Sequence, residues 1–93
     1  MSRYTVVWDR EFEAEFTLRW VESDSETRAI LTRASDWIDD RLAADPLGLG
    51  RPVKNLPIRS VIVPGTGVRP ATVYYQAMPD DRLIRILNII VES

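Results

Sequence analysis

The chain of 93 residues contains no cysteine and no histidine, and both absences exclude chemistry. Without cysteine there can be no disulfide scaffold, thiolate zinc site or cysteine nucleophile, and without histidine there can be no Ser-His-Asp triad. A metal site would have to consist of carboxylates alone. Glu11, Glu13 and Glu15 alternate along a predicted helix and therefore point in different directions. We interpret them as a solvated helix face and predict neither a metal nor another cofactor.

Long apolar runs are also missing. A membrane-spanning helix needs roughly 20 apolar residues, whereas the longest run, residues 86–91, is interrupted by Asn88. The first residues turn acidic at once and lack the apolar stretch of a signal peptide. With 45% apolar and 28% charged residues, the composition is that of a globular protein. We therefore predict a single domain over residues 1–93 that is cytoplasmic and has no membrane partner.

Acidic residues are absent from one third of the chain. The net charge is only −2, but residues 1–45 contain eleven acids and six bases, while residues 46–79 contain four bases and no acid. Those bases are Arg51, Lys54, Arg59 and Arg69. A polyanion responds to such a local patch more than to the total charge. The segment 46–79 is therefore the first place to look for a binding surface.

The first half of the chain has the pattern of one strand and two helices. Residues 4–8 are β-branched or aromatic and predict a strand, after which Asp9 can cap a helix that ends near residue 21. Its apolar residues recur at every fourth position, at Phe12, Phe16 and Trp20. Residues 23–26 read Ser-Asp-Ser-Glu, the form of a capping box that begins at Ser23, and predict a second helix. That helix should stop at residues 45–48, Asp-Pro-Leu-Gly.

The second half of the chain predicts only strands. Residues 48–57 contain several breakers and are expected to form a loop, followed by strands at 58–63, 72–77 and 83–91. The predicted order is therefore β-α-α-β-β-β. This order is typical of an α+β domain in which a helical hairpin packs on one face of a largely antiparallel four-stranded sheet.

Alternation along the last two strands separates the two faces of the sheet. Tyr74 and Tyr75 are neighbours, so one should pack under the helices while the other lies on the open face. The last strand is apolar on both sides, which favours a central position. Arg85 stands between Leu83 and Leu87, where an unpaired buried charge would be costly. We expect Arg85 to form either a salt bridge with Asp80 or Asp36 or a contact with a ligand or partner protein.

Several segments resemble the RelE/ParE superfamily of bacterial toxins. They are the helix-closing RLAADPLGLGRPVKNL, the strand Val73-Tyr74-Tyr75-Gln76, the hairpin Asp80-Asp81-Arg82-Leu83 and the opening YTVVWDREFEAEF. The resemblance extends over the whole chain and implies a RelE/ParE-like fold. It also implies the toxin of a type II toxin-antitoxin pair, neutralised by a cognate antitoxin.

The superfamily has two branches that differ in their targets. RelE-like members cleave mRNA in the ribosomal A site, and Arg51, Lys54 and Arg59 stand where those enzymes carry basic residues. ParE-like members poison DNA gyrase and have no RNA-cleaving set. This chain departs from the RNA-cleaving pattern in two places. Residues 71–72 read Ala-Thr in place of Tyr-Arg, and residues 90–93 read Ile-Val-Glu-Ser in place of a basic or tyrosine-bearing tail.

The resemblance and the charge pattern together lead to one hypothesis and two alternatives. We expect a non-enzymatic, ParE-like toxin that binds a macromolecular target, with gyrase as a candidate. The alternatives are a ribosome-dependent mRNA interferase, with Lys54, Arg59 and Tyr75 as catalytic candidates, and a non-toxic interaction module with the same fold. The candidate residues for binding the target or the antitoxin are Arg51, Lys54, Arg59, Arg69, Tyr74, Tyr75 and Arg85. An apolar sheet face would also be compatible with a homodimer.

Overall fold

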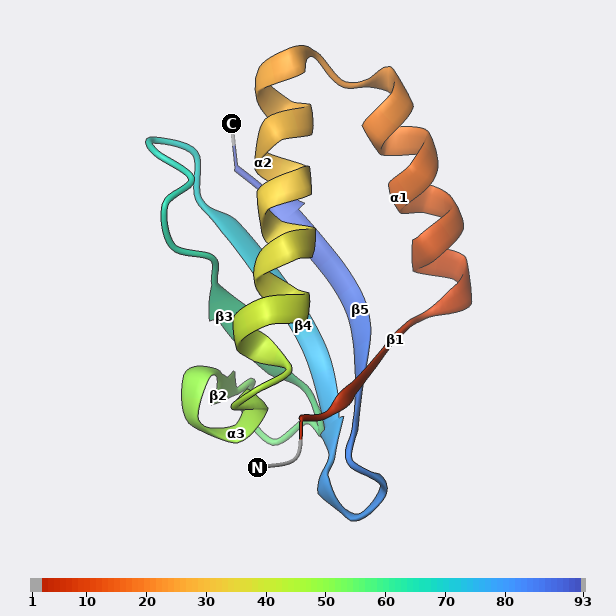
Figure 1. Cartoon of the computed structure of the whole chain (residues 1–93), viewed down its shortest axis with the longest axis vertical. Helices are drawn as coiled ribbons and strands as arrows, with labels where there is room; N and C mark the ends of the chain where they lie inside the picture. The colour runs from red at the N-terminus through yellow and green to blue at the C-terminus, as the bar shows by residue number, and fades with distance from the viewer. Residues whose placement is uncertain (1–2, 93) are drawn as a thin grey trace.

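The computed structural model of the chain describes residues 3–92 and forms two layers (Figure 1). The helical layer contains α1 (Arg10–Glu22), α2 (Ser25–Trp37), a π-helical turn η1 (Ile38–Leu42) and the short α3 (Pro46–Leu49). The strands are β1 (Thr5–Trp8), β2 (Arg51–Pro52), β3 (Arg59–Ile62), β4 (Ala71–Met78) and β5 (Leu83–Val91), with a 3-10 turn η2 (Pro79–Asp81) between the last two. The predicted α+β class and the helical hairpin are confirmed.

The sheet has five strands in the order β1-β5-β4-β3-β2, one more than expected. β1 pairs with β5 in parallel, and all other neighbours are antiparallel. The additional strand, β2, has two residues and pairs with β3 inside the segment that the sequence predicted as loop. Its Pro52 and short length explain why strand patterns do not reveal it. β5 lies between β1 and β4, so its predicted central position is confirmed.

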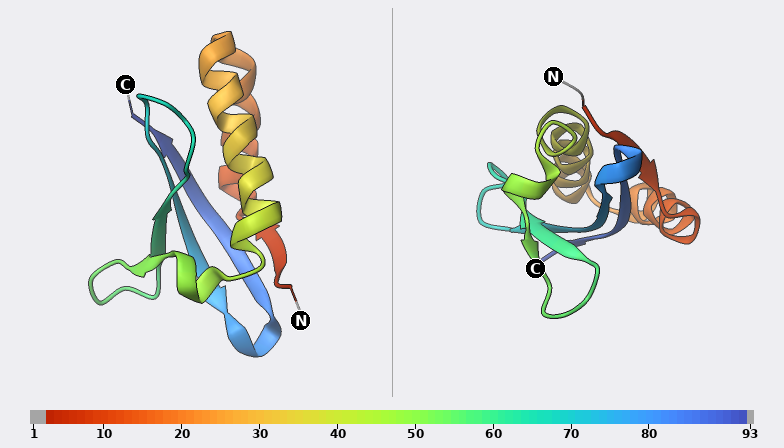
Figure 2. Two further views of the ribbon diagram at one scale, coloured as in Figure 1. Left: turned by 60° about the vertical axis from the view of Figure 1, so that its left-hand side comes forward. Right: turned by 90° about the horizontal axis from the view of Figure 1, so that it is seen from below.

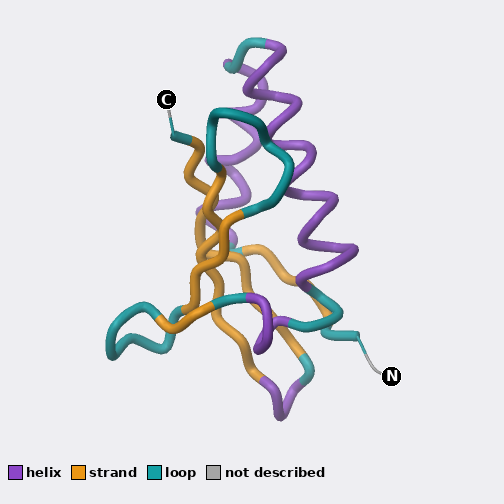
Figure 3. The backbone as a smooth tube through the Cα atoms, turned by 90° about the vertical axis from the view of Figure 1, so that its left-hand side faces the viewer, coloured by secondary structure: helices purple, strands orange, loops and turns teal. Residues whose placement is uncertain are grey.

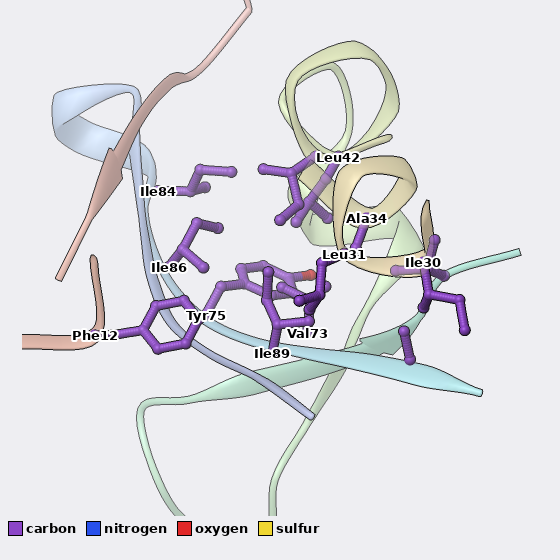
Figure 4. Packing of buried hydrophobic residues seen from close by; sticks show 13 residues of the cluster. Phe12, Ile30, Leu31, Ala34, Leu42, Val73, Tyr75, Ile84, Ile86 and Ile89 are labelled. Atoms are coloured by element: carbon purple, nitrogen blue, oxygen red, sulfur yellow. The ribbon is translucent and has the colours of Figure 1, made fainter. Parts of the chain in front are cut away.

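Both long helices lie on one face of the sheet (Figures 1 and 2). The core between the layers is built from α1, α2, η1 and the helix-facing side of the strands. Its members are Phe12, Ile30, Leu31, Ala34, Ile38, Leu42, Val63, Ala71, Val73, Tyr75, Ile84, Ile86 and Ile89. Figure 4 shows these 13 side chains, with Tyr75 among the ten that are labelled. Among the described residues, no helix is both long enough and apolar enough to cross a membrane.

Caps set the helix boundaries, and one of them differs from the expectation. Asp9 caps α1 as predicted, since its Oδ2 accepts a hydrogen bond from the Phe12 amide at 3.2 Å. The predicted Ser23 capping box is wrong. Asp24 caps α2 instead, through its Oδ1 and the Thr27 amide at 2.8 Å. Ser23 ends α1, and its hydroxyl donates to the carbonyl of Arg19. The connection between the two helices is thus one residue longer than a capping box at Ser23 would make it.

Residues 45–48 were predicted to end the second helix, and in the structure they contain the start of another helix. Asp45 Oδ1 accepts a hydrogen bond from the Gly48 amide at 3.1 Å, and Pro46 occupies the first turn, where its missing N–H has no cost. The four-residue α3 therefore replaces the first part of the expected loop. It lies beside the β2–β3 edge on the helical side of the sheet, where it meets the core (Figure 2).

Candidate binding face of the sheet

The sheet leaves the surface opposite α1 and α2 uncovered, and we call this surface the open face. Alternation along β4 assigns its side chains. Ala71, Val73 and Tyr75 are buried under the helices, while Thr72, Tyr74 and Gln76 take the opposite side. The predicted separation of the two tyrosines is confirmed, with Tyr75 inside and Tyr74 half-exposed on the open face.

Strand register arranges the open face in rows. Ile62, Thr72 and Ile90 form one row across β3, β4 and β5. Ser60, Tyr74 and Asn88 form the next, and Arg51 on β2 pairs with Ser60 at its edge. Gln76, Arg85 and Val7 form a third row across β4, β5 and β1. The open face thus has an apolar row near the C-terminal end of β5 and carries its polar and cationic side chains, Tyr74, Asn88, Gln76 and Arg85, toward the middle of the sheet.

Arg85 is exposed on this face and makes no ion pair within residues 3–92. The expected salt bridge with Asp80 or Asp36 is not formed. Its geometry explains why, because Asp36 belongs to α2 on the other side of the sheet. Arg85 pairs in register with Gln76 and Val7, both half-buried. The second expectation for Arg85, a contact with a ligand or partner, stays open.

Arg59 and Tyr75 face the other way, into the contact between the sheet and α3. Arg59 Nη2 donates to the carbonyls of Leu47 and Gly50 at 2.8 and 2.7 Å. The Tyr75 hydroxyl donates to the carbonyl of Pro46 at 2.5 Å. The two residues are register partners, so adjacent strands present a guanidinium and a phenol to the same loop. Two of the three catalytic candidates therefore hold α3 and the following Gly50 in place.

The environment of Tyr75 also affects its acidity. Burial raises the pKa of the Tyr75 hydroxyl above its ordinary value, and the neighbouring Arg59 guanidinium opposes that shift only in part. A phenol with a raised pKa keeps its proton more firmly at neutral pH. It is thus a poorer general base than an ordinary tyrosine.

The remaining bases of the acid-free segment 46–79 do not form one patch. Arg69 lies near the start of α2, where Nη1 donates to Thr27 Oγ1 at 2.8 Å and Nε donates to the Glu92 carbonyl at 3.0 Å. A long ion pair with Glu26, at 3.9 Å, completes its contacts. Arg51 and Lys54 are exposed at the β2 edge, and Lys54 has a left-handed φ of 50°. The segment therefore supplies two exposed cations at the β2 edge, while Arg59 and Arg69 are engaged by other parts of the chain.

The loop that contains Lys54 extends the open face. Residues 53–58 connect β2 to β3 and project from the sheet on the side away from α2 (Figures 2 and 3). Leu56 in this loop is 54% exposed. The open face is completed by four residues that were not among the predicted binding residues, namely Ser60, Ile62, Asn88 and Ile90. Only the strand register identifies them, because alternation alone does not say which face of each strand is covered.

Within residues 3–92 there is no group of three or more acidic side chains placed to hold a metal ion. The open face instead offers exposed guanidinium groups, a tyrosine and two exposed isoleucines. Such a surface can bind anionic or mixed polar and apolar partners through hydrogen bonds, stacking and apolar contact.

Three solved structures resemble this chain over nearly its whole length. A chain of the RelBE2 toxin-antitoxin complex from Mycobacterium tuberculosis superposes with a TM-score of 0.75 at 17% identity, covering 99% of this chain and 94% of its own. The isolated RelE toxin of E. coli has a TM-score of 0.58 at 12% identity, covering 97% and 85%. The chain has the RelE fold. The intact E. coli RelBE complex gives 0.54 at 12% identity, covering 97% and 96%.

The RelE fold confirms the RelE/ParE-like architecture that the sequence predicted. No family model matches the chain, and no curated protein matches its sequence. At 12–17% identity the likeness is one of fold.

Proposed function

We propose that the protein is the toxin of a bacterial type II toxin-antitoxin pair. The observation that carries the proposal is the RelE fold over almost the full chain, shared with structures described as an isolated toxin and as toxin-antitoxin complexes. On this proposal its partner is a cognate antitoxin, and both proteins act in the cytoplasm.

We infer that the toxin acts by binding a macromolecular target through the open face, as a ParE-like member would. Tyr74, Arg85 and Arg51 are the side chains on that face best suited to hold a partner. Two of the three catalytic candidates, Arg59 and Tyr75, are engaged by backbone carbonyls of the α3 region. Binding without cleavage is therefore better supported, and DNA gyrase is the first target to examine.

A ribosome-dependent mRNA interferase is the second candidate function. One observation favours it: a tyrosine lies on the same sheet face as Arg51 and Arg85. Guanidinium groups can hold phosphates, and a tyrosine can stack on a base. With Arg59 and Tyr75 engaged, Lys54 in the adjoining loop is the remaining catalytic candidate. A non-toxic interaction module, or a homodimer through the open face, would use the same surface.

Controlled expression separates these functions. The protein is induced from a tightly repressed promoter while growth, mRNA integrity at ribosomes, plasmid supercoiling and DNA breaks are recorded. The proposal expects arrested growth, altered supercoiling or breaks, and intact mRNA. Codon-linked mRNA cuts would replace the binding proposal with the interferase. Normal growth at verified protein levels would refute toxicity and leave the interaction module.

A further inference from the structure

The helix α1 has a second apolar side that the fold does not use. Its inner side is occupied by Phe12 and Phe16, whose rings pack with Trp8 at centroid distances of 5.7 and 5.2 Å. Ala14, Leu18 and Val21 are spaced four and three residues apart, which places them together on the opposite side. All three are exposed, with Leu18 at 61% and Val21 at 58%. We call these three residues the outer strip of α1.

The outer strip is not needed to hold α1 on the sheet. The inner aromatic cluster already anchors the helix, and α1 lies at the margin of the helical layer in Figures 1 and 2. Leucine and valine that remain this exposed forgo the free energy that their burial would supply. A helix of one protein commonly packs against a helix of another through a row of apolar side chains at helical spacing.

The charges beside the strip are predominantly negative. Helical spacing places Glu11, Glu15 and Glu22 along one side of the strip and Glu13 along the other. Glu15, Leu18 and Glu22 also line an open hollow of about 380 Å³. Arg19 shares that hollow and offsets the charge of Glu15, whereas Glu11 and Glu22 form no ion pair within residues 3–92. Arg19 Nη1 donates to the Ile89 carbonyl at 2.5 Å and its Nη2 pairs with Glu15 at 3.3 Å.

We propose that the outer strip docks an amphipathic helix of another protein, with lysine or arginine along the edge that meets Glu11, Glu15 and Glu22. The acidic edge selects this occupant. A second copy of the chain would bring α1 carboxylates against one another, and an anionic membrane would be repelled in the same way. A basic edge on the partner would pair with the acids while its apolar side covers Leu18 and Val21. Arg10, exposed in the first turn, lies by helical spacing on the other side of the strip, together with Glu13.

A displayed peptide library tests the inference on the whole folded protein. Its members are 16-residue helical peptides with an apolar stripe, whose flanking positions are randomised among Lys, Arg, Gln and Glu. Selection against the wild-type chain is expected to enrich Lys and Arg. The selected peptides should shift the amide resonances of α1 and bind more weakly as salt rises. Leu18→Glu should weaken them roughly tenfold or more, since it puts a charge into the apolar contact.

Two variants serve as controls. Val68→Glu makes the same change at an apolar residue that is 93% exposed in the β3–β4 loop, and it should leave binding unchanged. Glu15→Lys combined with Glu22→Lys should reverse the selected preference toward Glu. Circular dichroism confirms that each variant is folded before binding is compared. Absence of enriched peptides, enrichment of neutral or acidic edges, or binding that Leu18→Glu does not weaken would each overturn the proposal.

Discussion

Tyr75 connects the sheet to α3 through a single buried hydroxyl. The phenol donates to the Pro46 carbonyl, and Gly50 leaves room for it, because a Cβ at residue 50 would stand 2.0 Å from the hydroxyl oxygen. Such an approach is far below any real van der Waals contact. Gly50 and the Tyr75 hydroxyl therefore fit one another sterically. The free energy of unfolding of variants at each position tests this fit.

Removal of the Tyr75 hydroxyl should destabilise the fold. Tyr75→Phe keeps the ring in the core but leaves the buried Pro46 carbonyl without this donor, which costs about 1–2 kcal/mol. Urea denaturation measures the loss. Tyr74→Phe is the matched control, since Tyr74 lies half-exposed on the open face and its change should be close to neutral. Equal stability of the two variants would show that the hydrogen bond to α3 contributes nothing.

Gly50→Ala should be destabilising by about 1–3 kcal/mol because it overpacks the site of the Tyr75 hydroxyl. The same substitution should cost less in a Tyr75→Phe background, where the clashing oxygen is gone. A double-mutant cycle of urea unfolding free energies measures this coupling. Additive effects in the cycle would mean that the loop moves away from Tyr75 and that the two residues do not fit one another sterically.

Individual side chains were predictable only in part. Period-two alternation required Tyr74 and Tyr75 to occupy opposite faces, and it could not say which face the helices cover. The anchoring role of Arg59 was hidden, because its partners are carbonyls of α3, an element four residues long whose proline and glycine read as a helix stop. Charge patterning similarly grouped Arg69 with Arg51, although the fold places Arg69 beside α2.

Helices and strands were easier to predict from the sequence than the positions of single side chains. Hydrophobic periodicity predicts that an element is present, and capping residues predict where a helix begins and ends. The long helices and the three longer C-terminal strands were predicted close to their observed positions. β2 was not, because two residues that include a proline have no pattern of their own and depend on pairing with β3. Caps are local, and both Ser23 and Asp24 are good candidates. The structure favours Asp24, whose carboxylate accepts from the Thr27 amide, whereas the Ser23 hydroxyl donates to the Arg19 carbonyl.

The cap of α2 gives a prediction that depends on pH. The hydrogen bonds from the Thr27 amide and side chain lower the pKa of Asp24 below its ordinary value, and Arg69 and Arg28 add to the shift. The folded state therefore binds this proton less tightly than the unfolded state. The stabilisation is present above the unfolded pKa and is lost as pH falls through the folded pKa.

Asp24→Ala should lower the melting temperature at neutral pH, and the difference from wild type should shrink as the pH is taken below about 4. Thermal unfolding followed by circular dichroism across this range is the measurement. Ser25→Ala, one residue further along at an exposed position, is the control and should change little. A larger effect from Ser23→Ala than from Asp24→Ala would instead restore the capping box at Ser23.

The molecule as a whole separates its charges between its two surfaces. Acids outnumber bases by eight to five in α1, α2 and η1, while Arg51 and Arg85 lie on the open face with Lys54 in the loop beside it. A partner that binds the open face and one that binds the helical side would therefore differ in charge. Under the proposed function, substitutions on the open face should reduce target binding and leave the helical side unaffected.

Arg59, Tyr74 and Arg85 were all predicted from the sequence to bind the target or the antitoxin. The fold places Tyr74 and Arg85 on the open face and Arg59 on the other side of the sheet. Arg85→Gln and Tyr74→Ala should each relieve growth arrest, because loss of a charge-assisted or stacking contact weakens target binding by roughly tenfold or more. Both proteins should keep the wild-type melting temperature. Arg59→Ala should relieve growth arrest for a different reason, since it removes the donors to Leu47 and Gly50 and destabilises the fold.

Arg41→Gln is the control for charge, because it removes the same charge from an exposed residue of η1 on the helical side. Growth after induction, the soluble protein level and the melting temperature are measured for all four variants. If Arg59→Ala is inactive but as stable as wild type, Arg59 acts on the target and α3 must release it. If Arg85→Gln and Tyr74→Ala keep full toxicity while folded, the open face is not the surface that meets the target.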